Sequence, residues 1–261
     1  MRNILTLIIA CLCFAACSKE EAPTQYGNVK LSIEQGAAVF VKSGTSEVSD
    51  NYTVATVDAD NDAVDALSGT YGSIKDKQIM VPVGNYTVSA YNITETAAET
   101  GRGAQRFFGS SPLAVTAGDL ESISFTCTMD NARVSFVFDN TFKSLFDINN
   151  ATNPAKVTAS SAANSERKIE YNKDATLAED DSQIAYFNVS QNDATLNFTI
   201  TAVRKSDSAV KTYNKSITLQ KQSWHQVTIK AATTSGSADI SINVNETVTS
   251  VTHDIEVDPY N

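Results

Sequence analysis

Three stretches decide the fold: IMVPVGNYTVSAYN at residues 79–92, FFGSSPLAVTAGDLESISFTCTM at 107–129 and NARVSFVF at 131–138. Apolar and polar residues alternate in each stretch, and a period of two is typical of strands with one buried face. Pro82, Gly84-Asn85 and Ala117-Gly118-Asp119 supply the turns between these strands. We therefore expect an all-β chain in which these strands end one β-sandwich and begin a second.

The same alternation continues in both directions along the chain. Phe142, Leu145 and Phe146 have helical spacing, which predicts one helical turn within 141–148. The predicted domains are an N-terminal sandwich at 27–129 and a C-terminal sandwich at 130–261. The other expected strands are 28–34, 38–41, 52–57, 78–81, 156–159, 168–171, 183–189, 196–204, 210–219, 224–229, 238–244 and 247–257.

Composition agrees with a folded β protein. The 261 residues are enough for two domains of ordinary size, and 5 Pro and 11 Gly argue against a disordered or collagenous chain. The 9 Tyr and 11 Phe favour strands. A net charge of -10 disfavours nucleic acid and anionic membrane surfaces as partners.

The first residues have the pattern of a signal peptide, predicted at 1–16. Arg2 precedes an apolar run from Ile4 to Ala16 that is too short to span a bilayer. The run ends in Phe14-Ala15-Ala16-Cys17, which resembles a bacterial lipobox, although Phe14 replaces the usual Leu. The resemblance implies cleavage before Cys17 and lipidation of its thiol. The alternative is an ordinary signal peptide followed by an incidental cysteine.

Residues 17–26 are expected to be a lipidated tether that joins the outer membrane lipid to the first domain. Ser18, Lys19, Glu20 and Glu21 form a short polar-acidic tag that resembles the surface-export signal of Bacteroidota lipoproteins. Its presence implies a cell-surface location on the outer membrane.

Cysteine usage is consistent with this processing. Cys11 and Cys13 leave with the signal peptide and Cys17 carries lipid, so Cys127 alone remains and the mature chain has no intrachain disulfide. Cys127 is in phase with Ile123 and Phe125, which favours a buried small apolar residue over a nucleophile.

One acidic segment has the spacing of a calcium loop. Asp58, Asp60 and Asp62 match the start of an EF-hand loop, but Ala63 replaces the required Gly and Gly69 occupies the place of the bidentate Glu. We therefore interpret the segment as an acidic hairpin turn, with no metal site and no cofactor expected.

The sequence predicts that the chain is not an enzyme. It has no P-loop, GxSxG, HExxH or paired CxxC motif. His225 and His253 lie on predicted strands and are interpreted as structural residues. Ser165 and Lys168 match Ser-x-x-Lys, but they lie in a predicted polar loop without the companion motifs.

Two exposed features are candidate sites. A flexible loop at 101–106 precedes Phe107 and Phe108, of which one is expected to point inward and the other to form a contact surface. Phe108 and Tyr91 are the candidates for sugar stacking. Ser208 is a candidate O-glycosylation site, because Asp207-Ser208-Ala209 resembles the pattern glycosylated in exported Bacteroidota proteins and falls in a predicted hairpin turn.

A family resemblance covers nearly the whole chain. It rests on the lipobox, the VPVGNYTVSAY segment at 81–91, the Cys127 strand, the NARV segment at 131–134 and the SADISINV segment at 237–244. Together they resemble the fimbrillin-like surface lipoproteins of Bacteroidales, and in particular a lipoprotein subgroup of unassigned function. The resemblance implies two tandem transthyretin-like β-sandwiches. The members of that family include fimbrial stalk subunits, anchors, tip adhesins and many proteins with no known role.

One departure from that family bears on function. Polymerising members lose a leading strand to an Arg-specific protease, but no Arg lies between Cys17 and Arg102. This favours a permanently anchored fimbrial accessory or anchor subunit, or an adhesin-like binding protein. The expected partners are fimbrial subunits, host matrix or glycans. The alternative is a surface glycan-binding lipoprotein of a polysaccharide-utilisation system.

Overall fold

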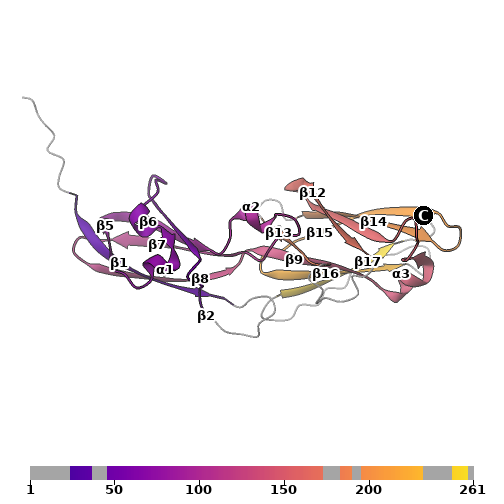
Figure 1. The fold of residues 1–261 in the computed structure, drawn as a ribbon, viewed down its shortest axis with the longest axis horizontal. Helices are drawn as coiled ribbons and strands as arrows, with labels where there is room; N and C mark the ends of the chain where they lie inside the picture. The colour runs from indigo at the N-terminus through magenta and orange to yellow at the C-terminus, as the bar shows by residue number, and fades with distance from the viewer. Residues whose placement is uncertain (1–23, 37–45, 173–182, 190–194, 232–248, 258–261) are drawn as a thin grey trace, which may run out of the picture.

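A computed structural model describes residues 24–36, 46–172, 183–189, 195–231 and 249–257. The predicted all-β class is confirmed, since the described chain consists mostly of strands in an elongated molecule (Figure 1). Its buried apolar side chains form two clusters, one spanning 29–129 and the other spanning 132–257. We call the parts around these two cores the first and second units. The strands predicted at 38–41 and 238–244 lie outside the described residues.

The first unit is built on one eight-stranded sheet with the order β2-β1-β8-β7-β6-β3-β4, and β5 pairs with β1. Three short helices, η1 (Asp65–Leu67), α1 (Tyr71–Ile74) and α2 (Glu95–Ala98), lie in its connections. The strands are β1 (Tyr26–Gln35), β2 (Ser46–Glu47), β3 (Thr53–Asp58), β4 (Gly69–Thr70), β5 (Ile79–Pro82), β6 (Gly84–Tyr91), β7 (Phe107–Val115) and β8 (Leu120–Met129).

This sheet encloses its core because β7 and β8 pair only at one end, where Phe107 faces Met129 and Phe108 faces Thr128. These are the two β7–β8 pairs of the described residues, and apolar side chains from β1 and β6 meet in one cluster. Gly109 permits the close approach, because a Cβ there would lie 2.7 Å from the Thr126 carbonyl oxygen.

The second unit has two sheets: a five-stranded sheet, β10-β14-β11-β12 with β15 beside β14, and a four-stranded sheet, β13-β9-β16-β17. The segment predicted as a helical turn is α3 (Asn140–Leu145), which begins where the Asp139 carboxylate accepts a hydrogen bond from the Phe142 amide at 2.9 Å. The strands are β9 (Asn131–Phe138), β10 (Phe146–Asp147), β11 (Lys156–Ser161), β12 (Asn164–Asn172), β13 (Ala185–Asn188), β14 (Thr195–Arg204), β15 (Val210–Thr218), β16 (Ser223–Ala231) and β17 (Thr249–Val257).

Aromatic side chains fill the second core. Phe136 meets the edges of Tyr171 and Phe198 at centroid distances of 4.7 and 5.0 Å. Phe142 stacks between Phe138 and Phe146 at 4.8 and 4.4 Å, which ties α3 to β9. Edge and stacked geometries of this kind add packing energy beyond the buried area alone.

Strand β9 is buried on both faces, so the expectation of a half-exposed strand at 131–138 is wrong. On the face away from the core, the Arg133 guanidinium lies 4.5 Å from the Trp224 ring centroid. The Trp224 indole Nε1 donates to Ser135 Oγ at 3.1 Å. The polar and charged residues of this face predict exposure to solvent, but the structure buries them.

The two histidines form a buried pair between the parallel strands β16 and β17. His225 Nδ1 lies 3.0 Å from His253 Nε2, and His225 Nε2 accepts the Gln220 backbone amide at 3.0 Å. Because Nε2 is an acceptor, the proton of a neutral His225 belongs on Nδ1 and is donated to His253. Ser223 Oγ lies 2.7 Å from the same Nε2 and donates its proton to the Gln220 carbonyl. The network is satisfied only while both rings are neutral.

We expect this pair to make the fold acid-sensitive above the range in which carboxylates titrate. Burial, followed by the neighbouring His253, lowers the pKa of His225 to about 4, whereas an unfolded histidine titrates near 6.5. The unfolded chain therefore binds more protons, and stability falls as pH decreases from about 6.5 toward 4. Urea unfolding should show a lower midpoint at pH 5.5 than at pH 7.5. A His225→Leu/His253→Leu variant with an equally steep pH dependence would contradict this assignment.

None of the helices in the described ranges has the length and hydropathy needed to cross a membrane.

Candidate functional site

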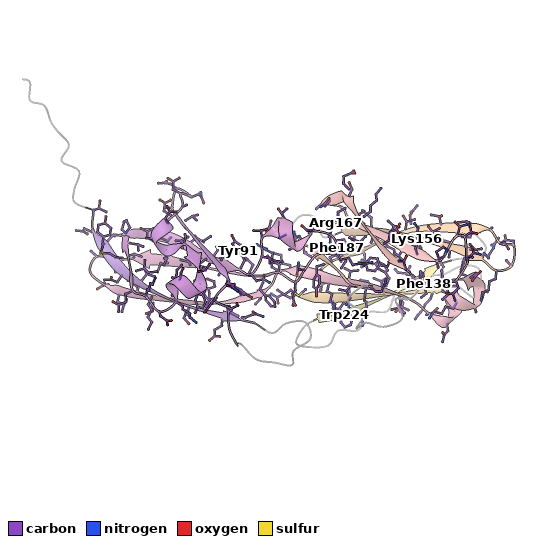
Figure 2. The ribbon with its side chains drawn as sticks, in the orientation of Figure 1. Tyr91, Phe138, Lys156, Arg167, Phe187 and Trp224 are labelled. Carbon is purple, nitrogen blue, oxygen red and sulfur yellow. The ribbon has the colours of Figure 1, made fainter. Side chains whose placement is uncertain are left out.

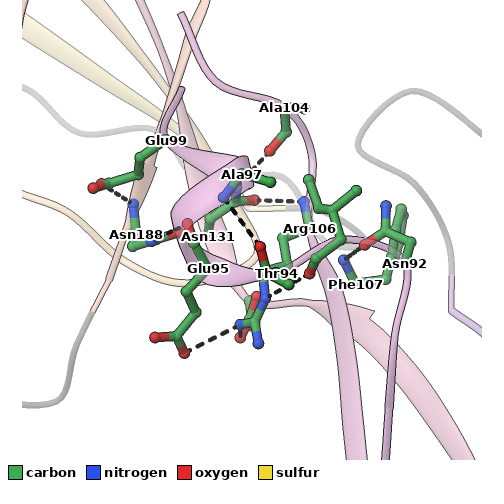
Figure 3. Close-up of polar contacts among 12 residues, drawn as sticks. Asn92, Thr94, Glu95, Ala97, Glu99, Ala104, Arg106, Phe107, Asn131 and Asn188 are labelled. Atoms are coloured by element: carbon green, nitrogen blue, oxygen red, sulfur yellow. Dashed lines mark hydrogen bonds and ion pairs between the residues drawn. The ribbon is translucent and has the colours of Figure 1, made fainter. Parts of the chain in front are cut away.

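The segment 92–106 between β6 and β7 forms a compact connection at the junction of the two units (Figure 3). Thr94 Oγ1 accepts the Ala97 amide at 3.2 Å and begins α2. The Ala104 amide donates to the Ala98 carbonyl at 3.0 Å, across a turn that Gly103 makes with a φ of 80°. The loop predicted at 101–106 is present, and backbone hydrogen bonds hold it in a compact conformation.

This junction segment contacts the second unit through hydrogen bonds to main-chain groups. Glu99 Oε1 accepts the Asn188 amide at 2.9 Å, and Asn188 Nδ2 donates to the Glu95 carbonyl at 3.0 Å (Figure 3). The Arg102 carbonyl accepts the Tyr186 amide at 2.8 Å. Arg167 Nε donates to the Gly101 carbonyl at 3.0 Å, and the Arg102 guanidinium donates to the Glu170 carbonyl. The loop is thus tied to β13 by one backbone hydrogen bond and by the Glu99 and Asn188 side chains, and to β12 by two arginine side chains.

A buried ion pair lies beneath α2. The side chains of Arg106 and Asp130 are 8% and 13% exposed and contact each other directly, while the carboxylate of Glu95, an exposed residue, lies 3.5 Å from Arg106 Nη1. Arg106 Nε also donates to the Ile93 carbonyl at 3.2 Å. Burial raises the pKa of Asp130 and the Arg106 charge opposes that rise. The charged form of Asp130 therefore depends on the neighbouring Arg106 for its stability.

A polar pocket of about 460 Å³ opens between α2 and the second unit. The Arg167 guanidinium lies 3.7 Å from Glu99 and 4.8 Å from the centroid of the Phe187 ring, which it covers (Figure 2). Carboxylates, amides and hydroxyls in this arrangement can hydrogen-bond a polar ligand such as a sugar, but the lining contains no aromatic face for stacking. The lining includes Glu95, Glu99, Thr100, Asn164, Arg167 and Asn188.

The predicted aromatic contact surface is largely covered. Phe107 is 5% exposed and belongs to the first core, so it cannot be part of such a surface. Phe108 is half-buried, and the Arg106 guanidinium lies 5.1 Å from its ring centroid. Tyr91 is half-buried beside the same guanidinium, at 5.9 Å. The Arg106 guanidinium thus lies over both rings, and neither is among the well-exposed large apolar side chains of the described residues.

Ser208 lies in the turn between β14 and β15, where the sequence predicts it. The turn is exposed, and Ser208 has a φ of 58°. Asp207 Oδ1 accepts the Ala209 amide at 3.1 Å and Arg204 Nε at 3.0 Å, so this carboxylate fixes the turn, and Ser208 is exposed within it. The position is accessible to a modifying enzyme.

We expect native protein to carry a glycan at Ser208. Intact-mass measurement should show an increment of sugar mass that disappears in Ser208→Ala and persists in Ser206→Ala, a neighbouring exposed serine outside the motif. A native mass equal to that of the lipidated polypeptide alone would reject this site.

The other sequence candidates have structural roles or lie outside the described residues. Asp58 Oδ1 accepts the amides of Asp60 and Asp62 at 2.9 Å each, which confirms a hairpin turn. Burial raises the pKa of the Cys127 thiol to about 12, so this cysteine is unreactive. Ser165 and Lys168 lie on strand β12 rather than in a loop, and their spacing of three directs them to opposite faces. Cys17, Ser18, Lys19, Glu20 and Glu21 lie outside the described residues.

A family model matches residues 25–259 of the chain. The chain belongs to the family described as "Domain of unknown function (DUF4493)". This membership is consistent with the resemblance to a fimbrillin-like lipoprotein subgroup of unassigned function. No curated protein matches the chain.

Two of the similar structures illustrate the level of likeness. A proposed cell adhesion protein from Bacteroides eggerthii has a TM-score of 0.41 at 10% identity, over 89% of this chain and 98% of that one. The fimbrial anchor protein Mfa2 from Porphyromonas gingivalis has a TM-score of 0.38 at 13% identity, over 72% of this chain and 82% of that one. Likeness at this level carries no information about ligand or partner.

Proposed function

We propose that this chain is a non-enzymatic, lipid-anchored cell-surface protein of the adhesin or fimbrial type. The proposal rests on the direction in which the strands run from the first unit to the second. Strand β8 runs parallel to β1 and then leads directly into β9, so β1 begins at the end of the first unit that is remote from the second unit (Figure 1). An anchor at Cys17, just before β1, would hold that end at the membrane and present the second unit outward.

Within this class, a permanently anchored accessory or anchor subunit is the finer proposal. Strand β1 pairs with β8 over eight residues, from Asn28 with Leu120 to Gln35 with Cys127. Its inward side chains Val29, Leu31 and Ile33 are at most 2% exposed and belong to the first core. A leading strand that is part of the core cannot be removed to expose an assembly groove without destabilising the unit.

A surface glycan-binding protein is the second candidate, favoured by the polar pocket beside α2. The pocket offers hydrogen-bonding groups from both units and matches the polarity of a sugar. Glycan binding in this pocket would differ from adhesion through the outward end of the second unit. It would depend on the exposed Glu95 carboxylate at the pocket.

Binding assays with the soluble chain from residue 24 onward test these proposals. We expect it to retain isolated fimbriae or host matrix proteins and to show no saturable binding on a glycan array. Glycan binding that Glu95→Gln abolishes would instead favour the second candidate. A turnover activity that a single substitution removes would contradict the non-enzymatic assignment.

A further inference from the structure

The first unit carries an exposed apolar patch at the end where the chain enters it. In the described ranges, five large apolar side chains are well exposed, and four of them are Tyr26 at 44%, Met80 at 62%, Val83 at 42% and Leu120 at 50%. These four residues lie at the start of β1, on β5, directly after β5 and at the start of β8. Single exposed apolar residues are ordinary, but a group at one place needs an explanation.

Strand register places three of these residues on one outer face. Strand β1 lies between β5 and β8, and its Asn28 faces Met80 on β5 and Leu120 on β8. Tyr26, two residues before Asn28, faces Pro82. Paired residues point to the same side of a sheet, so Tyr26, Met80 and Leu120 lie on the face opposite the core. Val83 is adjacent, because its amide donates to the Gln25 carbonyl at 2.8 Å. We call Tyr26, Met80, Val83 and Leu120 the tip patch.

The same face becomes polar as it leaves the tip. Along β1 the outward residues after Tyr26 are Asn28 and Lys30, and along β8 they are Ser122 and Ser124 after Leu120. Asp119 and Glu121 flank the patch, and Thr116 Oγ1 lies 2.9 Å from a carboxylate oxygen of each. An apolar end bounded by polar and charged groups suits shallow contact with a boundary between water and a nonpolar phase.

The length of the tether limits how far the tip patch can lie from an acylated Cys17. Tyr26 lies nine positions after Cys17 in the sequence. Fully extended at about 3.4 Å per step, this stretch of chain reaches at most about 30 Å. We propose that the tip patch rests on the lipid surface beside the acylated Cys17, with the Tyr26 ring at the level of the headgroups, where tyrosine is favoured. This inference rests on the lipid anchor of the proposed function. The tether makes the contact intramolecular, so a small patch is sufficient.

Quenching by nitroxide lipids tests the contact. Mature lipidated protein is reconstituted into phosphatidylcholine–phosphatidylethanolamine vesicles, with an environment-sensitive maleimide dye on Met80→Cys or on Val210→Cys. Val210 is the matched control, since it is 50% exposed but lies on β15 in the second unit, and the buried Cys127 does not react. Nitroxide on the upper acyl chain should reduce the Met80 probe's fluorescence about twofold, since interfacial burial reaches about 5–10 Å, and leave the Val210 probe unchanged.

A second variant excludes insertion driven by the dye itself. Tyr26→Ser/Leu120→Ser in the Met80→Cys background should abolish quenching while flotation with vesicles is unchanged. Three outcomes would overturn the proposal: equal, unquenched signals at both positions on floated vesicles, quenching that survives the double substitution, or a concentration-dependent blue shift in detergent, which indicates a second copy at the patch. Failure of the protein to float with vesicles would instead contradict the lipid anchor of the proposed function. Flotation is measured independently of quenching, so the two failures are distinguishable.

Discussion

Replacing Cys17 with alanine should transfer the protein almost completely from the membrane fraction to the soluble fraction. The apolar run before Cys17 supplies a translocation signal but is too short to remain as an anchor. Acyl chains on Cys17 would hold the mature protein at about 0.8 kcal/mol per buried CH₂, so several chains make release negligible. Without them only the tip patch faces lipid, which is too little apolar surface for stable attachment. Ultracentrifugation of cell envelopes measures the partition.

Ser18→Ala is the matched control, because it alters the neighbouring residue and keeps the acylated thiol. It should stay with the membrane and gain the acyl mass of the native protein. Membrane retention of Cys17→Ala after a carbonate wash would show that another segment anchors the chain.

Removing the buried arginine at the junction should have the largest effect on stability. Arg106→Ala leaves the Asp130 carboxylate, 13% exposed, without its cationic partner, and it removes the hydrogen bond to the Ile93 carbonyl. Breaking one side of a buried ion pair costs about 3–5 kcal/mol, because the remaining charge stays desolvated. The free energy of unfolding from urea titration at pH 7.5 measures the loss.

Lys156→Ala provides the comparison with an exposed pair, since Lys156 and Glu170 are 40% and 53% exposed and 2.8 Å apart. It should cost less than about 1 kcal/mol. Adding Asp130→Asn to Arg106→Ala should recover part of the stability, because the buried charge is removed. Equal losses for Arg106→Ala and Lys156→Ala would show that the junction pair is not energetically important.

Much of the fold follows from local patterns. The alternation in 196–204 and 210–219 predicts β14 and β15 to within a residue at each end, and the helical spacing of Phe142, Leu145 and Phe146 predicts α3. These features depend on residues close together in the chain. The pattern fails at β9, because alternation reports the face toward the core and cannot show that Arg133 and Trp224 cover the other face.

The junction and the tip patch could not be predicted, because distant residues form them. Glu99 meets Asn188 across 89 positions, and Arg102 reaches the Glu170 carbonyl across 68. Helix α2 depends on the Thr94 cap and on these contacts, since one turn has little intrinsic stability. A weak local signal for α2 existed in Thr94-Glu95, a cap followed by an acidic residue. Likewise, Met80 and Leu120 share a face only because β1 lies between their strands.

In the proposed arrangement, an anchor beside β1 holds the first unit at the outer membrane and displays the second unit to the outside. Labelling of intact cells with a membrane-impermeant maleimide tests it, with Val210→Cys as the exposed target and Cys127 buried. We predict that Val210→Cys is labelled on intact cells. The Lys19→Ala/Glu20→Ala/Glu21→Ala variant should remain lipidated and be labelled only after permeabilisation. Labelling of otherwise native Val210→Cys only after permeabilisation would contradict surface display.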